Sequence, residues 1–208
     1  MNIVIDPPVK GEWAILNPPG HPELAFDFLA VNDRKLPYRG IDMVLHILAT
    51  IPVTATYAWA QPAYAPLDGT VVACSDGNPD RERTGMIYDL LRLLLHRPKP
   101  GAPFSAYGGN YVILRCGDVY PLLAHLRNGS VRVRDGDTVR AGDQLGEVGN
   151  SGSSIQPHLH FQIMSSEDPF PLFENLLPFS LREAEKRIKG EWKTVNYAVL
   201  ANGDHLRF

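Results

Sequence analysis

Residues 157–163 read Pro-His-Leu-His-Phe-Gln-Ile, a run in which histidines alternate with apolar side chains. Alternation of this kind predicts a β-strand, because successive side chains of a strand point to opposite faces of its sheet. His158 and His160 are then expected on one face, and Leu159 and Phe161 on the other. Two imidazoles about 7 Å apart on one strand face can serve the same metal centre.

A turn and a second apolar run lie upstream of this strand. The sequence Gly-Asn-Ser-Gly-Ser at 149–153 predicts a turn before it. His125 lies at the end of the apolar run 122–126 and precedes a polar turn at 127–129. Catalytic side chains are commonly placed where an element of the scaffold meets a loop. His125, which alone would be interpreted as structural, therefore joins His158 and His160 as a candidate site residue.

The chain as a whole is predicted to be mainly β. Its 18 glycines and 18 prolines divide 208 residues into short segments, as in folds built from many short strands. Strand-like runs occupy residues 13–16, 24–31, 69–74, 111–116, 119–126, 144–148 and 158–164.

Two segments depart from this pattern. Between residues 86 and 96 apolar residues recur at helical spacing, and glycine- and proline-rich flanks mark residues 76–109 as a helical insertion between two strands. The insertion is interpreted either as a lid or wall of a substrate cleft, or as a helix that covers exposed core. In the tail, residues 181–189 have a helix-forming composition, whereas 192–200 are typical of a strand.

Composition limits the classes of partner. A net charge of −3 without a basic block gives no indication of a nucleic-acid or anionic-membrane partner. No apolar run approaches the ~20 residues needed to span a bilayer. Residues 1–8 do not resemble a signal peptide, so the sequence as written indicates a cytoplasmic protein, or one whose export signal is not part of this chain. Cys74 and Cys116 are expected to be buried free thiols.

Five ordered motifs resemble the lysostaphin/LytM family of zinc endopeptidases, which cut peptidoglycan cross-bridges or stem peptides and are usually extracytoplasmic. Residues 157–161 match the family's Pro-His-Leu-His-Phe motif, and residues 123–126 resemble its Tyr-Ala-His-Leu motif. The other similarities lie at 65–72, 109–112 and 139–149.

The resemblance implies a lysostaphin-like fold of antiparallel sheets, a duplicated hybrid motif with a groove along one face. Residues 1–208 would form a single metallopeptidase-like domain. Its core would span about residues 12–178, with 76–109 as the helical insertion and 179–208 as a strand-rich C-terminal extension.

The resemblance also assigns roles to individual residues. Zinc in this family has three protein ligands, namely a histidine and an aspartate from an N-terminal motif and the second histidine of the His-x-His pair. His160 thereby becomes a ligand of Zn²⁺. His125 and His158 become the catalytic histidines, which act on water and on the transition state.

The N-terminal ligands depart from the family's usual His-x-x-x-Asp pattern. Residues 38–42 imitate that pattern, but Tyr38 stands at the histidine position, and neutral tyrosine is a poor zinc ligand. His21 and Asp27 have a longer spacing. Phe residues on both sides of Asp27 predict a strand whose carboxylate faces away from the core. His21 and Asp27 are therefore preferred to Tyr38 and Asp42 as the remaining metal ligands.

These residues predict a zinc-dependent endopeptidase that hydrolyses peptide bonds, with peptidoglycan-like peptides as substrates. The competing hypothesis is a degenerate family member that has lost a ligand and acts as a peptide-binding or regulatory module. Tight binding of a single zinc ion per chain would distinguish the two. His46, His96 and His205 have no motif around them and are expected to be structural or exposed.

Overall fold

The computed structural model describes residues 3–18, 21–40, 47–95, 98–99, 101–170 and 174–208. Its strands are β1 (Ile3–Ile5), β2 (Glu12–Leu16), β3 (Phe26–Ala30), β4 (Ile51–Pro52), β5 (Pro62–Tyr64), β6 (Gly69–Ser75), β7 (Arg83–Thr84), β8 (Asn110–Arg115), β9 (Tyr120–Leu126), β10 (Thr138–Val139), β11 (Gln144–Glu147), β12 (Leu159–Met164), β13 (Phe179–Ile188), β14 (Glu191–Ala198) and β15 (His205–Arg207). The helices are η1 (Val53–Ala55), a 3₁₀ turn, and the α-helices α2 (Met86–Leu95) and α3 (Phe104–Gly108).

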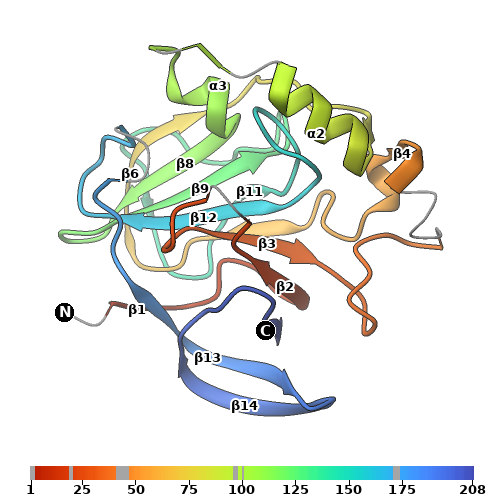
Figure 1. The fold of residues 1–208 in the computed structure, drawn as a ribbon. Helices are drawn as coiled ribbons and strands as arrows, with labels where there is room; N and C mark the ends of the chain where they lie inside the picture. The colour runs from red at the N-terminus through yellow and green to blue at the C-terminus, as the bar shows by residue number, and fades with distance from the viewer. Residues whose placement is uncertain (1–2, 19–20, 41–46, 96–97, 100, 171–173) are drawn as a thin grey trace.

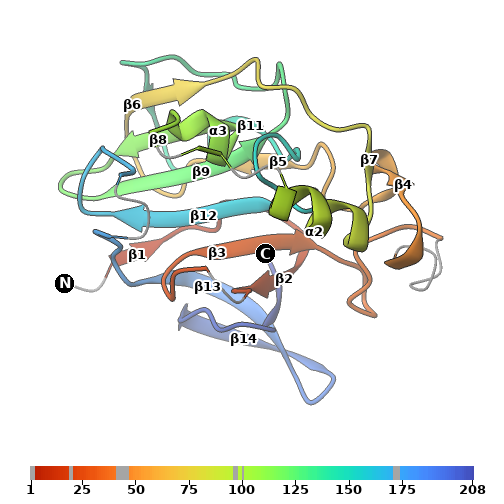
Figure 2. The ribbon, with the colours of Figure 1, turned by 45° about the horizontal axis from the view of Figure 1, so that its top comes forward.

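One large sheet dominates the part of the chain that the structure describes (Figures 1 and 2). Its strand order is β1-β13-β15-β2-β3-β12-β9-β8-β6-β10, and β14 pairs with β13. Neighbouring strands are antiparallel except β1 and β13, which run parallel. Two small sheets, β11-β5 and β4-β7, accompany it. The expectation of a mainly β fold built from antiparallel strands is confirmed.

The tail differs from its helix-forming composition. The segment from Leu181 lies in β13, which pairs with β1, β14 and β15. Leu181 and Ala184 are buried. Helix propensity is a weak preference, and these strand pairings together with apolar burial outweigh it.

The helical insertion contains α2 and α3, as the spacing of apolar residues predicted for the first of them. Ile87, Leu90 and Leu91 of α2 remain between 46% and 52% exposed. These three side chains therefore do not complete the core. Their exposure argues against the interpretation that they cover core surface.

The central strands separate an apolar face from a polar one. Phe28 of β3 and Phe161 of β12 are fully buried, and their ring centroids lie 6.1 Å apart. Because side chains alternate along a strand, Asp27 and His160 point to the other face. Cys74 and Cys116 are free thiols as expected, but they are half-buried rather than buried, so the expectation of full burial is wrong. No described helix has both the length and the apolar character that a membrane crossing requires.

Candidate metal centre

The register of the sheet brings Asp27 and His160 together. Asp27 of β3 and His160 of β12 are directly opposed partners across the antiparallel pair. On its other side, β12 places His160 opposite Ala124 of β9. The small alanine side chain is consistent with open space beside the imidazole. Phe26 and Phe28 pack into the core on the opposite face, as the aromatic neighbours of Asp27 predicted.

Three histidines surround the carboxylate of Asp27, which is buried. Nδ1 of His160 lies 3.0 Å from Oδ1, Nε2 of His158 lies 3.4 Å from Oδ1, and Nε2 of His21 lies 3.7 Å from Oδ2. One ligand atom from each of His21, Asp27 and His160 can be chosen so that all three lie within 4.8 Å of one another. The structure thus groups the three residues that the sequence analysis proposed as metal ligands.

His21 reaches the cluster from the turn that precedes β3. Its backbone N–H donates to the carbonyl of Pro18 at 3.0 Å. The side-chain amide of Asn17 donates to the carbonyls of Pro22 and Ala25, each at 2.7 Å. These bonds fix the longer connection between His21 and Asp27, so the unusual spacing still delivers both side chains to one place.

His125 and His158 lie beside this cluster, with ring centroids 4.8 Å apart. Nδ1 of His125 donates to the carbonyl of Ser151 at 2.9 Å, and Nδ1 of His158 donates to the carbonyl of Gln156 at 2.7 Å. His125 has a φ of 61°, a left-handed conformation that costs energy for any residue with a Cβ. With Nδ1 holding a proton, Nε2 of His125 is left to exchange protons with a substrate or water, whereas Nε2 of His158 lies 3.4 Å from Oδ1 of Asp27.

The environment separates the protonation states of these groups. Burial, together with the neighbouring His158 and His160, holds the pKa of His125 well below its usual value, so this ring is neutral near pH 7. Burial also lowers the pKa of His158, but the charge and hydrogen bond of Asp27 outweigh it, so that pKa is raised. Burial opposes ionisation of Asp27, yet His158 and His160 hold its pKa well below the ordinary range.

The donor set suits a zinc ion. Two imidazole nitrogens and one carboxylate oxygen are typical ligands of catalytic zinc, with a fourth position left open. Nδ1 of His21 is buried without a hydrogen-bond partner among the described residues. Nε2 of His160 donates to Oε1 of Gln162 at 3.1 Å, which leaves Nδ1 of His160 as the nitrogen that faces Asp27. An outer carboxamide that fixes the ring of a ligand histidine is a common feature of metal sites.

Sequence reasoning missed Gln162. The signal was present, because the alternation of side chains in residues 157–163 places Gln162 on the same face as His158 and His160. The structure also explains why glycine and asparagine stand at positions 109 and 110. A Cβ on Gly109 would lie 2.2 Å from Oγ of Ser151, and the N–H of Asn110 donates to that oxygen at 2.9 Å.

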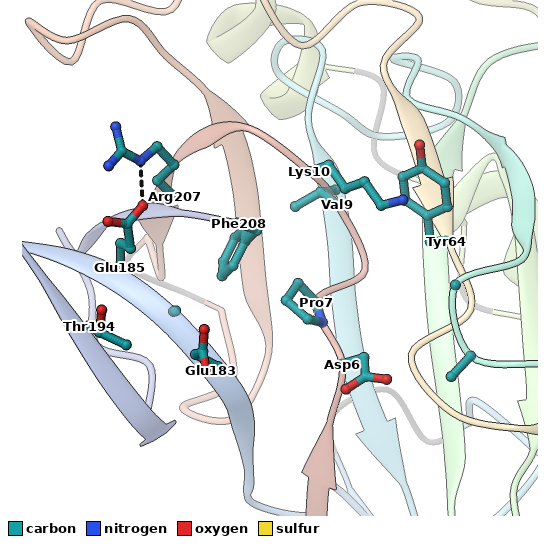
Figure 3. A pocket seen from close by; sticks show the side chains of 13 residues that line it. Asp6, Pro7, Val9, Lys10, Tyr64, Glu183, Glu185, Thr194, Arg207 and Phe208 are labelled. Atoms are coloured by element: carbon teal, nitrogen blue, oxygen red, sulfur yellow. Dashed lines mark hydrogen bonds and ion pairs between the residues drawn. The ribbon is translucent and has the colours of Figure 1, made fainter.

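A cavity of about 150 Å³ adjoins the cluster. Phe104 and Tyr107 of α3 line it together with His21, His125 and His160. The C-terminal part of the insertion therefore borders the candidate site. A larger cavity of about 480 Å³ lies by β13 and contains none of the predicted site residues (Figure 3). Its charged side chains include the Glu185–Arg207 ion pair.

The remaining sequence candidates lie elsewhere or outside the described residues. Tyr38 is buried and lines a different cavity, with Pro37 and Thr84. Asp42, His46 and His96 fall in segments that the structure does not describe. His205 is buried, with Nε2 2.6 Å from Oε1 of Glu12, in agreement with a structural role.

Part of the chain is similar to a known protein family. Residues 99–171 match the sequence profile of Peptidase family M23. This segment of the chain is therefore similar to peptidase family M23. The matched segment includes His125, His158 and His160, whereas His21 and Asp27 lie before it, so their grouping with His160 comes from the structure.

Distant relatives of the chain include peptidoglycan endopeptidases. Peptidoglycan DD-endopeptidase ShyA of Vibrio cholerae is 28% identical over 82 residues, which are 39% of this chain and 19% of that protein. Glycyl-glycine endopeptidase ALE-1 of Staphylococcus capitis is 30% identical over 108 residues, which are 49% of this chain and 30% of that protein. The chain thus matches less than a third of the length of either relative.

Among solved structures, the chain is similar to the catalytic domain of lysostaphin from Staphylococcus simulans. The two share 20% sequence identity and superpose with a TM-score of 0.39 over 82% of this chain and 91% of that one. A zinc-containing peptidase from Vibrio cholerae, 18% identical, gives a TM-score of 0.39 over 76% of this chain and 33% of that one.

Proposed function

We propose that this chain is a member of peptidase family M23 and a zinc-dependent endopeptidase that cleaves peptide bonds in peptidoglycan-like peptides. The observation that carries the proposal is the convergence of His21, Asp27 and His160 with two further histidines beside them. His21 and His160 would hold zinc through nitrogen and Asp27 through oxygen. Bound zinc supplies a Lewis acid and lowers the pKa of its water to about 7.

His125 is suited to accept a proton. Its pKa is lowered by burial, and its Nδ1–H is held by the carbonyl of Ser151, so Nε2 carries a free lone pair at neutral pH. In the proposed reaction, Nε2 takes a proton from the attacking water and later returns it to the leaving amine. A positioned general base of this kind contributes about 10²- to 10⁴-fold to the rate.

His158 is suited to hold a proton. Its pKa is raised because Asp27 outweighs the effect of burial, and its Nδ1–H is fixed by the carbonyl of Gln156. Nε2–H faces Oδ1 of Asp27 at 3.4 Å in this structure, and with Asp27 bound to zinc it would instead donate a hydrogen bond to the oxygen that gains negative charge as the carbonyl is attacked. Donors placed in advance at a developing oxyanion stabilise the transition state.

The substrate class rests on the relatives and on the cavity. The names of the relatives specify peptidoglycan and glycyl-glycine bonds. The cavity of about 150 Å³ beside the histidines is narrow, and Phe104 and Tyr107 limit it. Such a space favours an extended peptide with small side chains near the scissile bond.

The test is a cleavage assay with metal control. Metal-stripped protein and protein given one equivalent of zinc are incubated with cross-linked stem peptides and with glycine-bridged peptides, and the products are identified by mass spectrometry. Zinc-dependent cleavage at a defined bond, lost in His125→Ala, is expected. Peptide binding without cleavage by the zinc-loaded protein would instead identify a non-cutting binding module.

A further inference from the structure

The loop of residues 149–156, between β11 and β12, supplies the acceptors for both histidines beside the metal centre. The carbonyl of Ser151 accepts from His125, and that of Gln156 accepts from His158. Oγ of Ser154 also lies 3.2 Å from Nδ1 of His158. The positions of these loop atoms therefore set the orientation of the two rings.

A cluster from the insertion holds this loop. Arg81 donates from Nη1 to the carbonyl of Asn150 at 2.9 Å and from Nη2 to the carbonyl of Ser154 at 2.7 Å. Arg92 of α2 donates from Nη2 to the same Ser154 carbonyl at 2.9 Å. Arg81 thus bonds to the loop near both carbonyls that accept from the histidines. Arg92 bonds to it only near the carbonyl that accepts from His158.

Asp89 of α2 organises the two arginines. Its carboxylate is fully buried, with Oδ1 3.2 Å from Nε of Arg81 and 3.6 Å from Nε of Arg92. Oδ2 accepts from the hydroxyl of Thr84 at 2.8 Å and from the N–H of Gly85 at 2.9 Å. A buried carboxylate is tolerated only when it is paired and hydrogen-bonded, so this cluster is fixed as a unit.

The exposure pattern of α2 supports a role for charge rather than apolar packing. Asp89 is a buried side chain of this helix, whereas Tyr88, Leu91 and Leu95 are 53%, 52% and 77% exposed. A helix that merely covered the core would turn its leucines inward and its carboxylate outward. In α2 the side toward the 149–156 loop carries Asp89 and Arg92.

We propose that Arg81, Asp89 and Arg92 are positioning residues of the candidate active site. They hold the 149–156 loop so that the carbonyls of Ser151 and Gln156 orient His125 and His158. The catalytic consequence rests on the proposed endopeptidase function, but the effect on ring orientation does not. The insertion thereby contacts the candidate site in two places. Through Arg81 and α2 it holds the loop that orients the histidines, and through α3 it borders the cavity.

The test measures the imidazole N–H groups directly. In ¹⁵N-histidine-labelled protein, the hydrogen-bonded Nδ1–H resonances of His125 and His158 are recorded by NMR at neutral pH. Arg81→Lys keeps the charge beside Asp89 but loses the forked contact with two carbonyls. It is expected to shift or broaden both resonances. Arg92→Gln removes one contact on one side and is expected to perturb only the His158 resonance.

Arg83→Gln is the matched control, because this neighbouring arginine is exposed and bonds to Thr50. It should leave both resonances unchanged. Zinc content should stay as in the unmodified protein for all three variants, since the proposed ligands lie on β3, β12 and the preceding turn. If the unmodified protein cleaves peptides, Arg81→Lys should lower kcat about 10- to 100-fold with little change in KM.

Each outcome of these measurements supports or overturns the proposed positioning role. Unchanged resonances in folded Arg81→Lys protein would overturn the proposal, whether or not the protein is an enzyme. If Arg81→Lys does not fold, Arg92→Gln decides, and an unperturbed His158 resonance in it counts against the cluster. Perturbed resonances in a protein that never cleaves peptides would retain the positioning role and remove only the proposed function.

Discussion

Nδ1 of His160 lies 3.0 Å from Oδ1 of Asp27, although 133 residues separate the two along the chain. The pairing of β12 with β3 sets this distance, because the two residues are directly opposed in the register. A slip of one residue would turn one of the two side chains to the apolar face. The stability of the sheet and the geometry of the metal centre therefore depend on the same strand pairing.

The first prediction separates the roles of the two histidines of the His-x-His pair. His160→Ala should lose zinc, because it removes a proposed ligand. His158→Ala should keep most of its zinc and lose most of the cleavage activity, because His158 lies beside the ligands and contacts Asp27 at 3.4 Å. Zinc content after dialysis, measured with activity on the same samples, checks both. Equal zinc content in the two variants would show that the ligand assignment is wrong.

The second prediction separates the two candidate carboxylates. Asp27→Ala and His21→Ala should each abolish zinc binding, since a site with two protein ligands loses affinity by orders of magnitude. Asp42→Ala should retain zinc at the level of the unmodified protein. Competition with a chelator of known affinity measures all three. A loss confined to Asp42→Ala would transfer the ligand role to that residue.

The third prediction concerns Gln162, which holds Nε2 of His160 at 3.1 Å. Gln162→Ala removes this acceptor but no ligand, so zinc affinity should fall about 10- to 100-fold rather than vanish. Gln144→Ala in β11 is the control, because that side chain bonds to the carbonyl of Gly146 and lies outside the cluster. Identical zinc affinities for the two variants would remove Gln162 from the metal centre.

Local patterns in the sequence were sufficient for the central strands and for their histidines. The alternation at 157–163 predicted which side chains of β12 face the core, and the aromatic residues around Asp27 predicted the same for β3. These predictions succeed because burial of one face imposes a period of two. The same alternation of side chains favoured Asp27 over Asp42. Ligand chemistry favoured His21 over Tyr38, because neutral tyrosine is a poor zinc ligand.

Long-range contacts were not predictable from local patterns. The helix-forming composition of 181–189 gave no sign of its pairing in β13, which depends on partners at both ends of the chain. Asp89 and Arg81 lie in the segment 76–109, for which the sequence prediction used only the spacing of apolar residues. The contact of Arg81, which Asp89 pairs with, reaches the 149–156 loop across about a third of the chain, and no short motif records it.

The fourth prediction concerns the two thiols. Burial, aided by Asp135 at Cys74 and by Asp68 at Cys116, raises the pKa of each thiol to about 11. Because the thiolate is the reactive form, only roughly one thiol in a thousand is reactive at pH 8. A thiol reagent should react slowly at pH 8 and about tenfold faster for each unit of pH up to 10. Rapid reaction of both thiols at pH 8 would contradict the raised pKa values.

The most direct test of the metal centre is a crystal structure of the zinc-loaded protein with anomalous data collected at the zinc absorption edge. A single anomalous peak is expected at roughly 2.0–2.2 Å from a nitrogen of His21, a nitrogen of His160 and a carboxylate oxygen of Asp27. A peak bound by Asp42 and distant from Asp27 would contradict the assignment. If the protein bound no zinc at Asp27 or at Asp42, the proposed endopeptidase function would be contradicted. The alternative of a peptide-binding module that does not cleave would then be favoured.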